Sequence, residues 1–166
     1  IIKGGYANMN ESFDFYVTIK PKEKKAVQTD PITHKEIPEM YHVEPVSTRS
    51  DYALGFNALT ADVESPKFTV KHGDGIHIYG LTMGDEVIIR EGKNEYVMTV
   101  VDKSPDSTYL TAPVTAPAKD PVTGDDIGTK GTFTLKKDEA KAEVENKKPY
   151  IAPTGLVMNV APYALM

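Results

Sequence analysis

Proline and glycine interrupt this chain along its whole length. Its 166 residues include 12 prolines and 12 glycines, and both residue types break helices. Between them lie short runs rich in valine, isoleucine, threonine, tyrosine and phenylalanine, which are residues that favour strands. The sequence therefore predicts an all-β fold, an antiparallel sandwich or small barrel of several hairpins, with at most one or two short helices.

Composition excludes several classes of protein. The net charge is −5 and the longest basic run is the short Lys20–Lys25 segment, so we expect no nucleic-acid partner, which would need a cationic surface. The chain contains no cysteine, which rules out disulfides and zinc–thiolate sites. No apolar run reaches the ~20 residues that span a bilayer, so we expect no membrane contact either.

The length fits one domain. We predict a single β domain over residues 1–154, with proline-rich loops at 30–47 and 113–130, and an apolar terminal strand or arm at 155–166. Clear strand patterns cover Ser12–Pro21 and Met40–Val46. A helix capped by Ser50 or Asp51 is one option for the segment that follows, and residues 138–148 have the composition of a short helix or a charged loop.

Two segments match the pattern of β-hairpins. In residues 67–81 the loop would be Gly73-Asp74-Gly75, because this register gathers four apolar side chains on one face. In residues 85–102 a turn at Gly92-Lys93 would place Arg90 opposite Glu95 as a charge-matched pair. Apolar residues on both faces of this second hairpin predict that it lies centrally in the fold or at a subunit contact.

His72, Asp74 and His77 form the most site-like cluster in the sequence. In the hairpin register, however, the two imidazoles point to opposite faces of a pleated ribbon and cannot share an ion. Asp74 would sit at the loop tip between two glycines. We therefore interpret the cluster as a bend between strands, with no metal site and no catalytic site.

Residues 30–37 and 120–127 share the pattern D-P-[I/V]-T-x-x-x-I. Aspartate followed by proline fits a type I turn, because the carboxylate caps backbone N–H groups and proline presets φ. We interpret the repeat as shared turn chemistry. In the second copy, Asp120, Asp125 and Asp126 could also hold calcium, although the spacing differs from a regular calcium loop.

No catalytic residue can be assigned from the sequence. It contains no G-x-S-x-G motif, no cysteine and no phosphate-binding loop, so we expect neither enzymatic activity nor a cofactor. Tyr79, Tyr96 and Tyr109 could in principle stack on nucleic-acid bases, but we predict that they are buried strand tyrosines.

Both termini are apolar, which is unusual for the free ends of a monomer. They could form a terminal strand of the domain's own sheet, or an arm that adds to a neighbouring subunit's sheet. The interface candidates are Ile1, Ile2, Tyr6, Leu156, Val157, Val160, Tyr163, Leu165 and Met166.

Residues 76–117 contain an apolar strand, the motif Leu-x-x-Gly-Asp-x-Val, a polar turn, Tyr-x-Met-x-Val-Val and Ser-Thr-x-Leu-Thr. This series resembles small β-rich virion proteins of tailed bacteriophages, of the decoration, auxiliary capsid, head-fibre or head–tail connector type. The resemblance implies a non-enzymatic structural protein of the virion that forms homo-oligomers and contacts neighbouring capsid proteins. The alternative is a cell-surface or secreted adhesion or carbohydrate-binding β-sandwich module.

Overall fold

The computed structural model describes residues 2–3 and 9–149, with side chains from residue 9 onward, and this part of the chain contains strands and turns but no helix. The strands are β1 (Ile2–Lys3), β2 (Phe13–Lys20), β3 (Gln28–Thr29), β4 (Glu36–Ile37), β5 (Met40–Val46), β6 (Ala58–Thr60), β7 (Phe68–Val70), β8 (Gly75–Ile78), β9 (Glu86–Glu91), β10 (Val97–Asp102), β11 (Val114–Lys119), β12 (Asp126–Thr134) and β13 (Ala142–Lys147).

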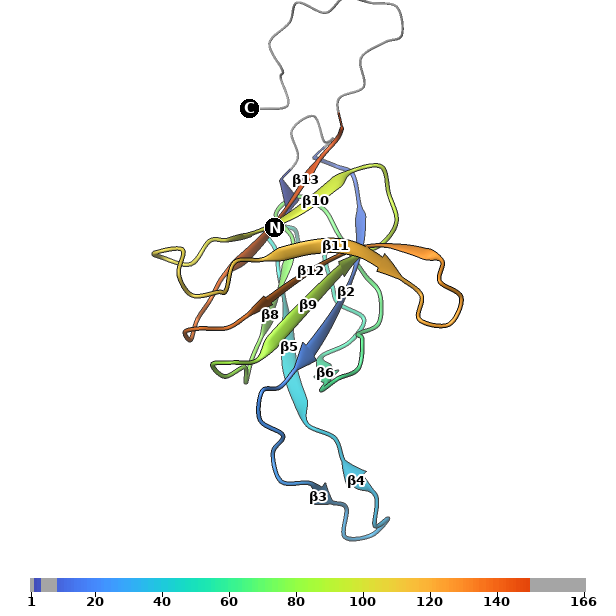
Figure 1. The fold of residues 1–166 in the computed structure, drawn as a ribbon, viewed down its shortest axis with the longest axis vertical. Helices are drawn as coiled ribbons and strands as arrows, with labels where there is room; N and C mark the ends of the chain where they lie inside the picture. The colour runs from blue at the N-terminus through green and yellow to red at the C-terminus, as the bar shows by residue number, and fades with distance from the viewer. Residues whose placement is uncertain (1, 4–8, 150–166) are drawn as a thin grey trace, which may run out of the picture.

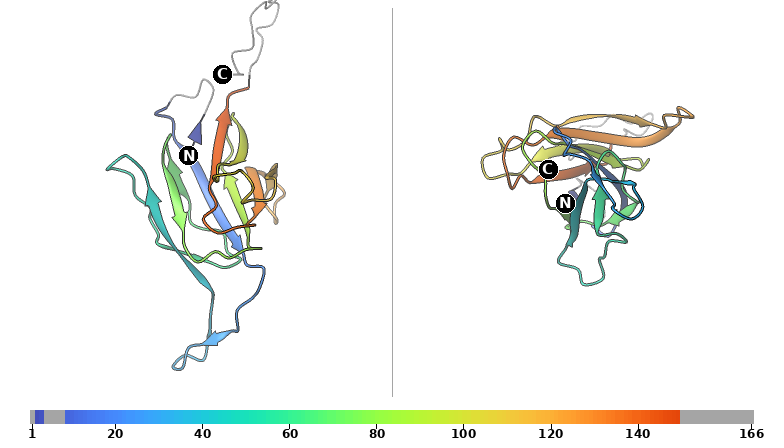
Figure 2. Two further views of the ribbon diagram at one scale, coloured as in Figure 1. Left: turned by 90° about the vertical axis from the view of Figure 1, so that its left-hand side faces the viewer. Right: turned by 90° about the horizontal axis from the view of Figure 1, so that it is seen from below.

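The strands form a sandwich. A five-stranded sheet has the order β11-β12-β9-β2-β7, and two three-stranded sheets have the orders β6-β5-β8 and β1-β13-β10. Every strand pair is antiparallel except β1–β13, which is parallel. Figures 1 and 2 show the sheets layered against one another, with the β3–β4 hairpin projecting from one end of the body. The all-β prediction is confirmed, and the form is a sandwich.

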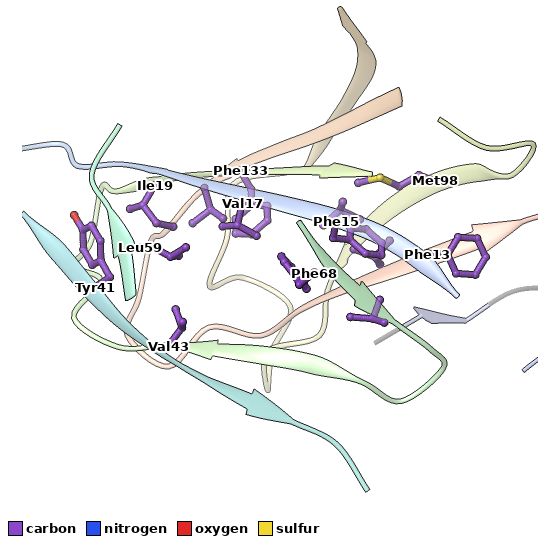
Figure 3. Close-up of a cluster of buried hydrophobic side chains, with 14 of the residues drawn as sticks. Phe13, Phe15, Val17, Ile19, Tyr41, Val43, Leu59, Phe68, Met98 and Phe133 are labelled. Atoms are coloured by element: carbon purple, nitrogen blue, oxygen red, sulfur yellow. The ribbon is translucent and has the colours of Figure 1, made fainter. Parts of the chain in front are cut away.

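Strand β2 carries the strongest pattern of alternation. Its odd-numbered residues Phe13, Phe15, Val17 and Ile19 are buried, while the even-numbered residues between them are more exposed. They pack against side chains of the facing sheets, such as Tyr41 (Figure 3). Burying side chains of this size stabilises the fold by roughly 1.5–3 kcal/mol each, so β2 is the central element of the core.

Two predicted strands are confirmed. The Ser12–Pro21 pattern becomes β2, and the segment Met40–Val46 is β5 with the bounds expected. Proline at position 45 is tolerated in β5 because the pairing with β6 ends at His42, so β5 has an open edge at Pro45. Residues 30–47 and 113–130 therefore contain strands as well as turns.

The predicted hairpin at 67–81 is wrong. Strand β7 pairs with β2, whereas β8 pairs with β5 in a different sheet. The connection between them, which includes Gly73 with a φ of 88°, crosses from one layer of the sandwich to the other. It is a bend between two strands, as expected, but the two strands are not hydrogen-bonded to each other.

The predicted hairpin at 85–102 is also wrong, because its two strands pair with other strands rather than with each other. Strand β9 lies between β12 and β2, while β10 pairs with β13. Arg90 therefore faces Tyr16 and Lys130 across its two ladders rather than Glu95. The central position expected for this segment is confirmed for β9.

The helical expectations are also wrong. Residues 142–147 form strand β13, in which Val144 and Asn146 are buried, and residues 50–66 contain no helix. Lysine and glutamate do not prevent a strand when the residues between them are needed by the core, because tertiary burial overrides a weak local helix propensity.

Gly128 marks a close approach of two backbones. It has a φ of 120°, and a Cβ at this position would lie 1.8 Å from the Glu91 carbonyl oxygen on β9. We expect Gly128→Ala to destabilise the fold by about 1–3 kcal/mol, because an L-residue is strained at this φ and the β12–β9 ladder must shift. Urea unfolding would measure the loss, and Gly124→Ala, with open space around its Cβ position, is the control for backbone strain alone.

Candidate functional site

The β3–β4 hairpin and its flanks, residues 21–39, are here called the stalk. No residue in the stalk is buried, and its ladder has only two pairs, Gln28↔Ile37 and Thr29↔Glu36. A two-stranded hairpin of this kind is marginally stable on its own, and it adds nothing to the core. Its contacts with the body lie at its base, where the Lys22 N–H donates to the buried Asp85 at 3.0 Å and the Glu39 carbonyl accepts from the Ala61 N–H at 2.8 Å.

The tip of the stalk is held by side-chain capping. The Asp30 carboxylate accepts hydrogen bonds from the backbone N–H groups of Ile32 and Thr33, at 2.8 and 2.7 Å. The bond from Thr33 has the largest effect and the bond from Ile32 the next largest, and both lower the pKa of Asp30. The Asp30 cap therefore persists at neutral pH. The turn expected for this segment is confirmed, and it presents Ile32 with 86% of its surface exposed.

The sides of the stalk carry charges of both signs. Lys22, Lys24 and Lys25 are exposed, with Glu23 as the acidic residue among them. The Lys25 Nζ atom lies 3.0 Å from the Glu39 Oε1 atom, so these two side chains form an ion pair. Over residues 21–39 the four lysines are matched by four acidic residues, so the stalk combines an exposed aliphatic tip with a shaft of mixed charge.

The β11–β12 hairpin repeats the same tip. Asp120 accepts hydrogen bonds from the N–H groups of Val122 and Thr123, at 2.8 and 3.0 Å, and Val122 is 91% exposed. Gly124 here and His34 in the stalk both have positive φ. The two tips share one turn geometry, which agrees with the interpretation of the repeat as turn chemistry.

Two of the three acidic residues predicted as calcium ligands, Asp120 and Asp126, have other partners. Asp120 caps its own turn, Asp126 accepts from the Gly128 N–H at 3.0 Å, and Lys93 lies 3.7 Å from Asp126. Within the described part of the chain, no group of three or more histidine or acidic side chains is arranged to hold a metal ion.

A groove of about 470 Å³ lies at the other end of the body from the stalk. Phe13, the first residue of strand β2, lines the groove, and β2 runs from there toward the stalk (Figure 1). The groove is lined by Glu11, Ser12, Phe13, Asp14, Tyr16, Arg90, Gly92, Lys93, Asn94 and Ile127.

The walls of the groove are preorganised by Arg90. Its guanidinium carbon lies 3.8 Å from the centre of the Tyr16 ring, and it donates to both carboxylate oxygens of Glu64 at 2.6 and 2.9 Å. A further bond reaches the Ile127 carbonyl at 3.0 Å. Because its donors are already engaged, Arg90 shapes the groove without presenting a free cation.

The sequence predicted that Asp74 lies at the tip of a loop. This prediction is wrong, because Asp74 is buried. It is 1% exposed and forms a bidentate pair with Arg49, at 3.1 Å to Nε and 2.6 Å to Nη2. Ser47 and the Lys71 N–H also donate to it. Burial acts to raise its pKa, but these hydrogen bonds lower the pKa overall.

Two of the four histidines, His42 and His77, lie close to Tyr79 on the surface, and the His42 and Tyr79 ring centres are 5.6 Å apart. His77 stacks on Tyr79 with ring centres 4.2 Å apart, and His42 shares the Glu44 carboxylate with Tyr79. Tyr79 is 43% exposed, so the expectation that it is buried is wrong. The structure does not bring His72, Asp74 and His77 together as a site.

The other tyrosines have mixed environments. Tyr96 is partly buried and donates its hydroxyl to Glu11, which raises its pKa to about 12. The Lys137 Nζ atom lies over the Tyr109 ring, 4.8 Å from the ring centre. The interface candidates at the termini lie outside the residues whose side chains are described, so the predicted terminal strand or arm stays a prediction.

A second buried polar cluster had no signal in the sequence. Glu91 is 2% exposed and accepts hydrogen bonds from the side-chain amides of Asn94 and Asn146, at 2.6 and 2.5 Å. Burial raises the pKa of Glu91. Its partners lie on different parts of the chain, so only the fold brings them together.

The fold defines an antiparallel β-sandwich module. By sequence the chain belongs to the family described as a domain of unknown function, DUF7601, whose model matches residues 1–148. Among curated proteins, none matches the chain. No helix in the described residues is long and apolar enough to cross a bilayer.

A solved structure has a similar fold. The major pilin from Streptococcus pyogenes, crystallised as a point mutant, matches with a TM-score of 0.51 and 17% sequence identity. The match covers 89% of this chain and 45% of the pilin chain, so this chain spans less than half the length of the pilin. At this identity the likeness concerns the fold.

Proposed function

We propose that this chain is a non-enzymatic structural module of a cell-surface assembly that acts through protein–protein contacts. The observation that carries the proposal is the likeness of its sandwich to the fold of a pilin, over 89% of the chain. The stalk supports it, because this exposed hairpin buries none of its residues in the body. Rigid sandwiches with projecting loops suit binding, since a stable scaffold positions the contacting residues.

The setting can be tested in the organism that makes the protein. An antibody raised against residues 9–149 is expected to label intact cells and to detect the protein in species larger than the monomer. Labelling of permeabilised cells alone would contradict the proposal. Recovery of the protein only with phage particles would support the virion setting, which rests on the resemblance of residues 76–117 and stays a prediction.

A further inference from the structure

The first and last strands of the described part of the chain lie side by side. Strand β1 pairs with β13 through Ile2↔Val144 and Lys3↔Glu145, in the one parallel ladder among the described strands. Because the two strands run in the same direction, the chain enters this pair at the start of β1 and leaves it at the far end of β13. A pull on the chain before Ile2 and after Lys147 therefore acts along the two strands in opposite directions.

Strand β13 is anchored in the body of the sandwich. Its other edge pairs with β10 along its whole length, from Val97↔Lys147 to Asp102↔Ala142. Its Asn146 side chain is 0% exposed and donates to Glu91 at 2.5 Å. Because Glu91 belongs to β9 in the five-stranded sheet, β13 is bound to two sheets. A load that reaches β13 is therefore shared with the body.

The direction of a pull decides how the hydrogen bonds between strands break. These bonds lie across the strands, so a pull along the strands loads all of them at once. A pull that separates two strands from one end breaks the bonds one pair at a time. Forced unfolding is governed by the unfolding rate rather than by equilibrium stability, so one fold can resist one direction of pull better than another.

We infer that the β1–β13 pair is the load-bearing joint of this module. Tension carried along the chain passes from β1 directly to β13, and the strands that lie between them in the sequence are outside this path. The inference rests on the proposed function, because a module of a surface assembly is pulled through its own chain when the assembly is under tension. It adds to that function the direction in which the module resists force.

Three directions of pull on the folded protein test the joint, and all three share a handle at Lys148→Cys. The chain contains no cysteine of its own, and Lys148 is exposed. The second handle is a cysteine added before Ile1, or Met9→Cys, or Val97→Cys, since Met9 and Val97 are 57% and 54% exposed.

Each second handle loads a different set of bonds. The handle before Ile1 pulls β1 against β13. The handle at Met9 lies after β1 in the chain, so β1 stays in place but carries no load. The handle at Val97, whose ladder partner is Lys147, opens the β10–β13 ladder from its end.

Single-molecule force spectroscopy at one pulling speed gives the comparison. We expect the unfolding force with the handle before Ile1 to be at least about threefold higher than with either other handle, because only that handle loads the joint along its strands. Urea unfolding of the same three variants without load is expected to give matching midpoints, which separates direction from stability.

Equal unfolding forces with the handles before Ile1 and at Met9 would overturn the inference, because β1 would then carry none of the load. Labelling of intact cells does not depend on the direction of pull. The proposed function is therefore judged separately from the joint.

Discussion

Replacement of Asp74 by alanine is expected to destabilise the protein by about 3–5 kcal/mol, which is the usual cost of removing one partner from a buried ion pair. The carboxylate is 1% exposed and receives hydrogen bonds from Ser47, Arg49 and the Lys71 N–H. Its loss leaves these donors, including the charged guanidinium, without their acceptor. The bonds also join the end of β5 to the connection between β7 and β8, so two layers of the sandwich lose a common tie.

Urea unfolding of Asp74→Ala beside Asp51→Ala measures this effect. Asp51 contacts the same guanidinium, at 2.9 Å, but its side chain is 76% exposed. Exposed pairs contribute about 0–1 kcal/mol, so the control should change stability little. If the two variants unfold at the same urea concentration, burial of the Asp74 pair is not what stabilises this corner of the fold.

Glu91→Gln is expected to change how stability depends on pH. Burial raises the pKa of Glu91 in the folded protein above its unfolded value, so the folded state binds more protons than the unfolded state between the two values. The contribution of Glu91 is therefore fully present below the unfolded pKa and is lost as pH rises through the folded pKa. One such group changes stability by up to about 1.4 kcal/mol per pH unit.

The wild-type protein should thus lose stability, relative to Glu91→Gln, as pH rises above the ordinary pKa of a glutamate carboxyl, because glutamine cannot ionise at this position. Free energies of unfolding measured from pH 5 to pH 9 give the comparison. Glu95→Gln is the control, because Glu95 is an exposed residue on the same connection. Parallel curves for the wild type and Glu91→Gln would show that Glu91 does not bind a proton more tightly in the folded state.

Local sequence patterns predicted the elements better than their partners. Strands β2 and β5 were predicted because their segments are rich in β-forming residues, which favour strands. The D-P-[I/V]-T turns were legible because their hydrogen bonds lie within four residues. The exposed aliphatic residue that both turns carry at the same position was a signal for the stalk tip that could have been read.

The pairing of strands was not legible in the same way. A short polar connection between two strands fits a hairpin, but it also fits a crossing between layers, as at Gly73 and Gly92. Whether two successive strands pair depends on which other strands occupy their edges. Here β2 and β12 pair with the two edges of β9, and β10 pairs with β13. Residues 142–147 were misread because their composition favours a helix, while the core required a strand.

The sequence by itself determined that this protein is built of short strands, where two of these strands, β2 and β5, lie, and where its two capped turns lie. These features follow from interactions between residues a few positions apart. Only the tertiary structure decided that Asp74 meets Arg49, that Glu91 meets Asn146 from 55 positions away, and that the stalk and the groove occupy opposite ends of the body. Such contacts join segments distant in the chain, and their partners are selected by the packing of whole sheets, which no local pattern specifies.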